Sequence, residues 1–257
     1  MKQFRQPHHH RPRKNLLVIG TNAVLTALRE GKALEKIYLQ SNIQGEEIED
    51  IRKLAHEQNV PVSRVPVEKI NRLNVSNHNG CVAQISKVQF QELQDVISFV
   101  VEKGEIPLIL MFDGITDIRN IGAMARSAKA FGVHAIVIPV KGVGAFNEDA
   151  ILTSAGALEE ISVCRVNSLM KAVDELHLNG IRVFASEMKA ESSISQCDFS
   201  IPSAIVMGGE EKGIYPALLN YCDEQFRIPM PGGFESLNVS VATGIILYEA
   251  ASQRLRG

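Results

Sequence analysis

The second part of the chain alternates short apolar segments with amphipathic ones, and this rhythm restricts the fold more than any other feature of the sequence. Strands are predicted at residues 108–112, 134–140, 161–166, 182–185, 204–207 and 225–228. Helices are predicted between and after them, at residues 120–131, 149–158, 169–178, 216–221 and 239–255. Continuous apolar strands that alternate with helices are typical of a parallel sheet covered on both faces. The pattern therefore predicts an α/β domain that binds its ligands beyond the carboxyl ends of the strands.

The preceding residues indicate a second, smaller α/β domain. Strand and helix patterns occur at residues 16–20, 22–29, 36–40, 46–58, 61–65 and 82–85. Residues 87–106 carry apolar side chains at helical spacing, and we interpret them as a linker. We therefore expect four parts, which are an arm (1–15), a small domain (16–86), the linker (87–106) and a large domain (107–257).

Composition excludes several classes of protein. The 257 residues are 45% hydrophobic and 22% charged, which is typical of a globular protein. No apolar run approaches the ~20 residues that span a bilayer, and the N-terminus lacks the apolar segment of a secretion signal. The four cysteines are far apart and form no CxxC pair. We expect reduced thiols, no metal site, no disulfide framework and a cytoplasmic location.

The charge is unevenly distributed along the chain. Residues 1–14 hold five basic residues and no acidic one, so this segment carries +5 and the remainder −7 of the net −2. A basic arm on an acidic body is typical of a contact with a polyanion, although a tail that contacts nothing has the same composition. The acidic body argues against a broad, charge-driven nucleic-acid binder, so any contact with RNA is expected to be local.

Two polar loops follow predicted strands of the large domain. The first leads into a helix with Asn120, Gly122 and Arg126, and read alone it is a helix capped by Asn120 with a surface arginine. The second, Gly208-Gly209-Glu210-Glu211-Lys212-Gly213, lets a ligand approach the backbone or forms a tight turn. It fits neither the dinucleotide fingerprint nor the phosphate-binding loop, which disfavours a nicotinamide-dependent oxidoreductase. The shorter Gly142-Val143-Gly144 also follows a strand.

The third loop is the most informative. It runs from Ile228 to Gly244, and its loop has two prolines and two glycines before Ser236 and Asn238, where an apolar helix follows. Prolines and glycines impose an unusual backbone path. Ser236 and Asn238 then either cap the helix or hold a ligand. Because three such loops occur in one predicted sheet, ligand binding is favoured, and a capping role is compatible with it.

The motifs in these three loops resemble those of the SpoU (TrmH-type) family of the SPOUT superfamily, whose members are RNA ribose 2′-O-methyltransferases. Asn120, Gly122 and Arg126 match the first family motif, and Gly208, Glu210 and Gly213 match the second. The third motif matches Ile228–Met230 and Ser236–Val239. One departure is Glu211, where the family usually has glycine. Residues 16–86 resemble the small ribosomal-protein-like RNA-binding domain that these enzymes often carry.

The resemblance implies a fold, a cofactor and partners. It implies a deep trefoil knot in the large domain, a homodimer, and S-adenosylmethionine held by the backbone at Gly208, Ile228 and Leu237. By this resemblance, the family's catalytic residues correspond to Arg126, Asn120, Glu210, Ser236 and Asn238, and the reaction needs no metal. The two-domain layout is most similar to enzymes that methylate a guanosine ribose in 23S rRNA. The substrate is thus expected to be RNA, with no partner in DNA or membrane.

Alternatives stay open at this point. By resemblance Arg126 contacts the 2′-hydroxyl as a base, but a guanidinium stays protonated, so a grip on the adjacent phosphate is an equally good hypothesis. The other four residues then orient Arg126, the nucleotide and the loop. A tRNA ribose methyltransferase of the same family fits the same motifs. A non-catalytic RNA-binding protein is disfavoured by the intact set of polar residues.

Overall fold

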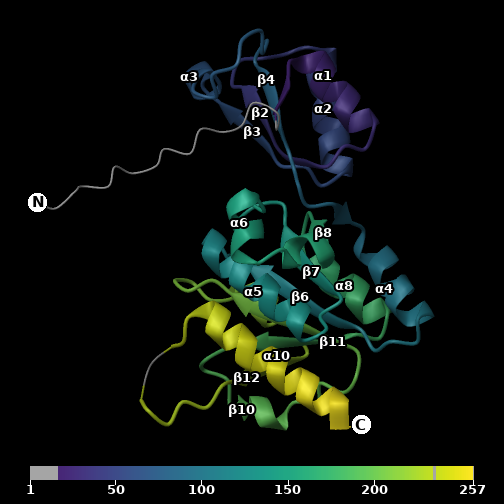
Figure 1. Cartoon of the computed structure of the whole chain (residues 1–257), viewed down its shortest axis with the longest axis vertical. Coiled ribbons are helices and arrows are strands. Elements are labelled where there is room, and N and C mark those ends of the chain that lie inside the picture. Colours follow the sequence, from purple (N-terminus) through teal and green to yellow (C-terminus); the bar gives the residue numbers. More distant parts are fainter. Residues whose placement is uncertain (1–16, 234–235, 257) are drawn as a thin grey trace, which may run out of the picture. The chain divides into compact units, whose positions relative to one another are not determined.

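The protein divides into two compact units between Ser86 and Lys87 (Figure 1). The computed structural model describes residues 17–233 and 236–256. The predicted basic arm, residues 1–15, lies outside the described residues. Each unit has its own hydrophobic core.

The smaller unit is a four-stranded sheet with two longer helices and one short helix. Its strands, in the order β1-β4-β2-β3, are β1 (Leu17–Ile19), β4 (Cys81–Ile85), β2 (Leu34–Gln40) and β3 (Val62–Val65). Its helices are α1 (Thr21–Arg29), α2 (Glu46–Glu57) and the unpredicted short α3 (Val67–Asn71). Strand β4 is antiparallel to both neighbours, whereas β2 and β3 are parallel. Apolar residues of α1 and α2, such as Leu28 and Ile51, are fully buried with Ile37 of β2, as their amphipathic spacing predicts.

The larger unit is an α/β fold around an eight-stranded sheet in which every strand pairs in parallel with its neighbours. The order is β10 (Ser192–Ser193), β12 (Glu224–Arg227), β9 (Arg182–Ser186), β11 (Ser203–Gly208), β6 (Leu108–Asp113), β7 (Ala135–Pro139), β8 (Ser162–Val166) and β5 (Phe90–Gln91). The helices are α4 (Leu93–Glu102), α5 (Ile118–Ala130), α6 (Glu148–Thr153), α7 (Ala157–Glu160), α8 (Leu169–Leu178), η2 (Ile194–Gln196), α9 (Pro216–Leu219) and α10 (Val239–Arg256). This confirms the predicted α/β class. The implied trefoil knot stays a prediction.

Both faces of this sheet are buried, as continuous apolar strands predict. Side chains alternate along β6, so Leu110 and Phe112 pack with α5 and α10, while Met111 packs with α4 and α8 on the opposite face. Helices α5 and α10 also pack against each other (Figure 1). The strand pattern of residues 108–113 therefore contributes to two cores at once.

Residues 87–106 and 149–158 also differ from the sequence-based expectation. Residues 87–106 are part of the larger unit, because Phe90 pairs with Val163 in the sheet and α4 buries Val96 and Ile97 in its core. The single helix expected at residues 149–158 is two helices. The chain breaks between α6 and α7 because Ala155 and Gly156 have φ values of 53° and 88°, which a right-handed helix does not accommodate.

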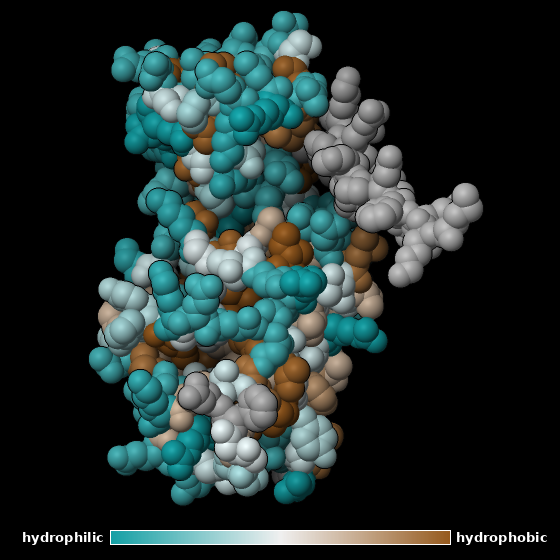
Figure 2. All heavy atoms as spheres, turned by 90° about the vertical axis from the view of Figure 1, so that its left-hand side faces the viewer, coloured by the Kyte–Doolittle hydropathy of each residue, from teal (hydrophilic) through white to brown (hydrophobic). Residues whose placement is uncertain are grey.

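Apolar side chains reach the surface of the larger unit between hydrophilic ones (Figure 2). On α10 the exposed apolar residues include Val241, Ile245 and Tyr248, with 51%, 39% and 62% of their surface accessible. Their spacing of four and three residues gives one stripe along the helix.

Candidate active site

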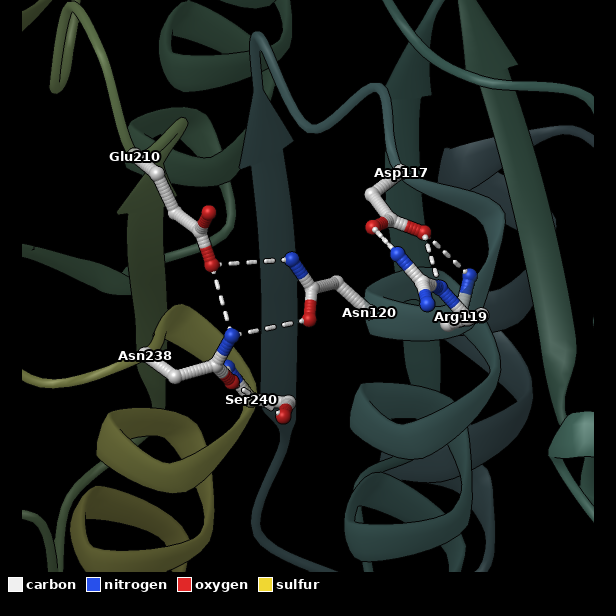
Figure 3. A network of polar contacts seen from close by, with 6 residues as sticks. All are labelled: Asp117, Arg119, Asn120, Glu210, Asn238 and Ser240. Carbon is white, nitrogen blue, oxygen red and sulfur yellow. Dashed lines mark hydrogen bonds and ion pairs between the residues drawn. The ribbon is translucent and has the colours of Figure 1, made fainter.

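Three side chains from three distant segments meet at the carboxyl edge of the large sheet (Figure 3). The Asn120 Nδ2 atom donates to Glu210 Oε1 over 3.0 Å, and Asn238 Nδ2 donates to the same oxygen over 2.6 Å. Asn238 Nδ2 also lies 3.1 Å from Asn120 Oδ1. Asn120 belongs to α5, Glu210 to the loop after β11 and Asn238 to the start of α10. One carboxylate oxygen thus ties the three predicted loops together.

Asn238 is both a helix cap and a member of this network. Its Oδ1 atom accepts from the Ser240 backbone N–H over 3.0 Å and from the Ser240 hydroxyl over 2.6 Å. Its backbone carbonyl accepts from Ala242 N–H over 3.0 Å, which is the first turn of α10. The cap and the ligand-binding interpretation are therefore compatible, because the amide uses its oxygen for one and its nitrogen for the other.

Asn120 is not the cap of its helix, in contrast to the sequence interpretation. Helix α5 begins two residues earlier, where Asp117 accepts from Arg119 N–H over 2.8 Å. The Arg119 guanidinium also bonds to this carboxylate, and these hydrogen bonds lower the pKa of Asp117. Because Asp117 supplies the cap, the Asn120 side chain is available to Glu210.

Glycines shape the loop that carries Glu210. A Cβ on Gly208 would lie 2.3 Å from the Gly213 carbonyl carbon, and one on Gly209 would lie 2.4 Å from the Gly114 oxygen. Gly213 N–H donates to Gly209 O over 2.8 Å with a φ of 63° at Gly213, which closes the turn. Only glycine allows these approaches.

Asp113 holds this loop against the end of β6. Its backbone oxygen accepts from Gly209 N–H over 2.9 Å, and its Oδ2 atom accepts from Tyr215 N–H over 2.6 Å. Sequence reasoning missed this role, although an acidic residue directly after a buried strand was the available signal. Ser240 was missed in the same way, and its signal was its place two residues after a helix-capping asparagine.

A cavity of about 700 Å³ opens beside the network. The three residues predicted to bind a cofactor, Gly208, Ile228 and Leu237, all line it. Glu210, Ser236 and Asn238 line it as well. Its volume is within the usual range for small-molecule sites, roughly 300–1,000 Å³.

Arg126 lies apart from the other four predicted catalytic residues. It is an exposed residue of α5, does not line this cavity, and has no side-chain hydrogen bond or ion pair to the described part of the chain. Arg126 follows Asn120 by six residues, so at ~100° per residue the two side chains are about 240° apart around the helix axis. Within one chain it therefore does not join the network of Asn120, Glu210 and Asn238.

Metal-binding clusters and membrane spans are both absent from the described ranges, 17–233 and 236–256. No group of three or more His, Cys, Asp or Glu side chains there is arranged to hold a metal ion. None of the helices in these ranges has the length and apolar character needed to cross a membrane. All four cysteines are free, and burial raises the pKa of the Cys81 thiol to about 12.

A parallel sheet with polar loops and a cavity at its carboxyl edge defines an α/β protein with a ligand site at the usual position. The sequence model of the SpoU rRNA Methylase family matches residues 107–248, and that of RNA 2′-O ribose methyltransferase substrate binding matches residues 17–91. The chain belongs to the SpoU methylase family.

Similar proteins span nearly the whole chain. One is YacO of Bacillus subtilis (strain 168), named in the TrmH family of tRNA/rRNA methyltransferases, which is 33% identical over 92% of this chain and 95% of its own. A Staphylococcus haemolyticus protein of the same description is 31% identical over 94% of this chain and 97% of its own. The crystal structure of the SpoU methyltransferase AviRb from Streptomyces viridochromogenes has a TM-score of 0.60 at 23% identity, covering 94% of this chain and 90% of that one. It supports the fold alone.

Proposed function

We propose that the protein transfers a methyl group from S-adenosylmethionine to a ribose 2′-hydroxyl of RNA, and that its acceptor is a guanosine of 23S rRNA. The observation that carries the proposal is the contact of Asn120 and Asn238 with Glu210 beside the 700 Å³ cavity. Family membership supports the RNA methyltransferase class. The choice of guanosine and 23S rRNA rests on the resemblance of the two-domain layout.

The cavity suits S-adenosylmethionine. Gly208, Ile228 and Leu237 line it, and Gly208 has no side chain to fill it. Glycine backbone lets a ligand lie directly on the chain. When bound, S-adenosylmethionine supplies a methyl group on a positively charged sulfur. AviRb, which has the same fold with a TM-score of 0.58, was itself crystallised in complex with AdoMet.

Glu210 is well placed to orient the acceptor hydroxyl. Its Oε1 atom already accepts from two amides, while its Oε2 atom has no hydrogen-bond partner among the described residues. In our proposal Oε2 accepts a hydrogen bond from the 2′-hydroxyl, which aligns the hydroxyl oxygen for in-line attack. Oε2 takes up the hydroxyl proton as the bond from oxygen to the methyl carbon forms and the bond from sulfur to that carbon breaks, which leaves S-adenosylhomocysteine as the product. Asn120 and Asn238 hold the carboxylate still, and Ser236 lines the same cavity.

We assign Arg126 to the phosphate next to the acceptor ribose. It is exposed and without an ion pair in the described part of the chain, so its guanidinium is available to an anion. A guanidinium does not lose its proton in proteins, which disfavours the role of base.

We also propose a homodimer. The exposed stripe of Val241, Ile245 and Tyr248 on α10 supports it, since an apolar helix face packs well against a second copy. The free cysteines support a cytoplasmic location, because thiols persist in reducing compartments.

The proposal is tested by labelled methyl transfer from S-adenosylmethionine to total RNA from a strain that lacks the protein, followed by mapping of the modified nucleotide. We expect a single 2′-O-methylguanosine in 23S rRNA. Labelled tRNA instead would favour the alternative substrate. Two findings support that alternative: the relatives are named tRNA/rRNA methyltransferases, and a solved structure that is 25% identical to this chain concerns 2-OH methylation on tRNA. DNA of the same sequence stays unlabelled because it has no 2′-hydroxyl. Binding of NAD but not S-adenosylmethionine in calorimetric titration would reject the enzyme class.

A further inference from the structure

We infer that a second, smaller cavity binds the acceptor nucleotide of the RNA, separately from the methyl donor. This inference rests on the proposed function. The cavity has a volume of about 440 Å³ and lies between the loop after β6, Gly142 of the loop after β7, and the glycine-rich loop after β11. This volume is within the range of small-molecule sites.

The two cavities share a wall that contains Glu210. Residues 209–213 and Val239 line both cavities. Asn120 lines only the smaller one and Asn238 only the larger one, and both donate to Glu210 Oε1. A ligand in each cavity would therefore meet at one carboxylate. A transfer between two bound molecules requires such a shared boundary, since the reacting atoms must come into line.

The wall of the smaller cavity is built by close backbone contact. Gly144 N–H donates to Ile115 O over 2.9 Å, and a Cβ on Gly144 would lie only 2.4 Å from Thr116 O. The loops after β6 and β7 are thus pressed together, which only a glycine permits. This gives the Gly142-Val143-Gly144 motif a function in shaping the cavity.

The chemistry of the lining matches a nucleotide. Lys212 is exposed and has no ion pair or side-chain hydrogen bond to the described residues, so its ammonium is available to a phosphate. Carboxylates of Glu210 and Glu211 and the Thr116 hydroxyl accept hydrogen bonds from ribose hydroxyls and base N–H groups. The third carboxylate, Asp117, is neutralised by Arg119 at 3.0 Å.

The first experiment fills each cavity in turn. Thr116 lines only the smaller cavity and Ser186 only the larger one, so Thr116→Phe and Ser186→Phe are matched variants. We expect Thr116→Phe to raise the KM for RNA about tenfold or more and to change the Kd of S-adenosylmethionine less than about twofold. Ser186→Phe should do the reverse and weaken S-adenosylmethionine binding. Thermal unfolding checks that both variants are folded. Equal loss of S-adenosylmethionine binding in both variants would overturn the inference.

The second experiment follows guanosine 5′-monophosphate and guanosine by NMR, with S-adenosylmethionine present. We expect shifts at Thr116 and Gly142 and about tenfold weaker binding of the nucleotide in Lys212→Met, down to the affinity of guanosine. The control Lys189→Met, which lines only the larger cavity, should bind the nucleotide as the wild type does. Displacement of S-adenosylmethionine by the nucleotide would overturn the inference. A wild-type protein that methylates no RNA, but shows these shifts, rejects the proposed function and leaves the nucleotide site supported.

Discussion

Asn238 donates an amide hydrogen to Glu210 over 2.6 Å while the oxygen of the same amide caps α10 through Ser240. One side chain thus fixes both the start of a long helix and the orientation of a carboxylate 28 residues earlier in the chain. The two tasks use different atoms, so substitutions can separate them.

Asn238→Asp should abolish most methyl transfer and keep the helix cap. Its carboxylate still accepts from Ser240, but it cannot donate to Glu210 and repels it. We expect turnover to fall about a hundredfold, as for a misplaced catalytic group. Asn238→Ala loses the cap as well, which costs about 1 kcal/mol of unfolding free energy. Urea unfolding beside single-turnover kinetics measures both. Equal activity of Asn238→Asp and wild type would reduce Asn238 to a cap.

Gly208→Ala should disrupt the loop that carries Glu210. Its methyl group would lie 2.3 Å from the Gly213 carbonyl carbon, so the backbone must move. We expect a loss of about 1–3 kcal/mol of stability and weaker S-adenosylmethionine binding by calorimetry. Gly232→Ala is the matched control, because nothing lies within 4 Å of its added Cβ. Loss of binding in the control alone would contradict the argument.

Arg126→Lys separates a base from a phosphate contact. If Arg126 holds a phosphate, lysine keeps the charge but loses the paired geometry, so KM for RNA rises while the pH–rate profile keeps its shape. A base at this position would instead shift the profile towards the lower pKa of lysine, ~10.4. Turnover and KM close to the wild type would exclude both roles.

Ile245→Glu should dissociate the proposed dimer. A charged side chain in the middle of the α10 stripe is costly to bury at a subunit interface. Sedimentation velocity should show a wild-type dimer and a mutant monomer with unchanged thermal unfolding of the fold. The control is Leu178→Glu, which changes an exposed apolar residue on α8 and should leave the dimer intact. A wild-type monomer would remove the dimer from the proposal.

Asp223 should contribute to the acid sensitivity of the larger unit. Partial burial alone would raise its pKa, but hydrogen bonds from Val183 N–H over 2.8 Å and from His177 over 2.9 Å outweigh it and lower the pKa. A carboxyl with a lowered pKa stabilises the fold above its unfolded value, about 3.9, and this contribution is lost as pH falls through the folded value. Between pH 5 and 2, roughly, wild type should lose more unfolding free energy than Asp223→Asn. Parallel urea curves for the two proteins would contradict this.

Local patterns determined the elements and their order. The apolar runs at 108–112 and 204–207 are strands because each must bury both faces, and loops of a parallel sheet gather at its carboxyl edge. The alternation of apolar strands with helices therefore predicted by itself that residues of the three loops lie near one another. The family resemblance then assigned them to one site.

Only the tertiary structure decided which side chains of those loops touch. Asn120 and Asn238 share one oxygen of Glu210, although they lie 118 residues apart in the chain. Asp117 rather than Asn120 caps α5, and Arg126 lies apart from the network. All three facts depend on how the segments are rotated and how far apart they lie in space. The same holds for residues 87–106, whose helical spacing is satisfied equally by a linker and by a helix packed on the sheet. Periodicity along a chain specifies which face of an element is buried, but the neighbour that buries it is chosen by packing of the whole domain.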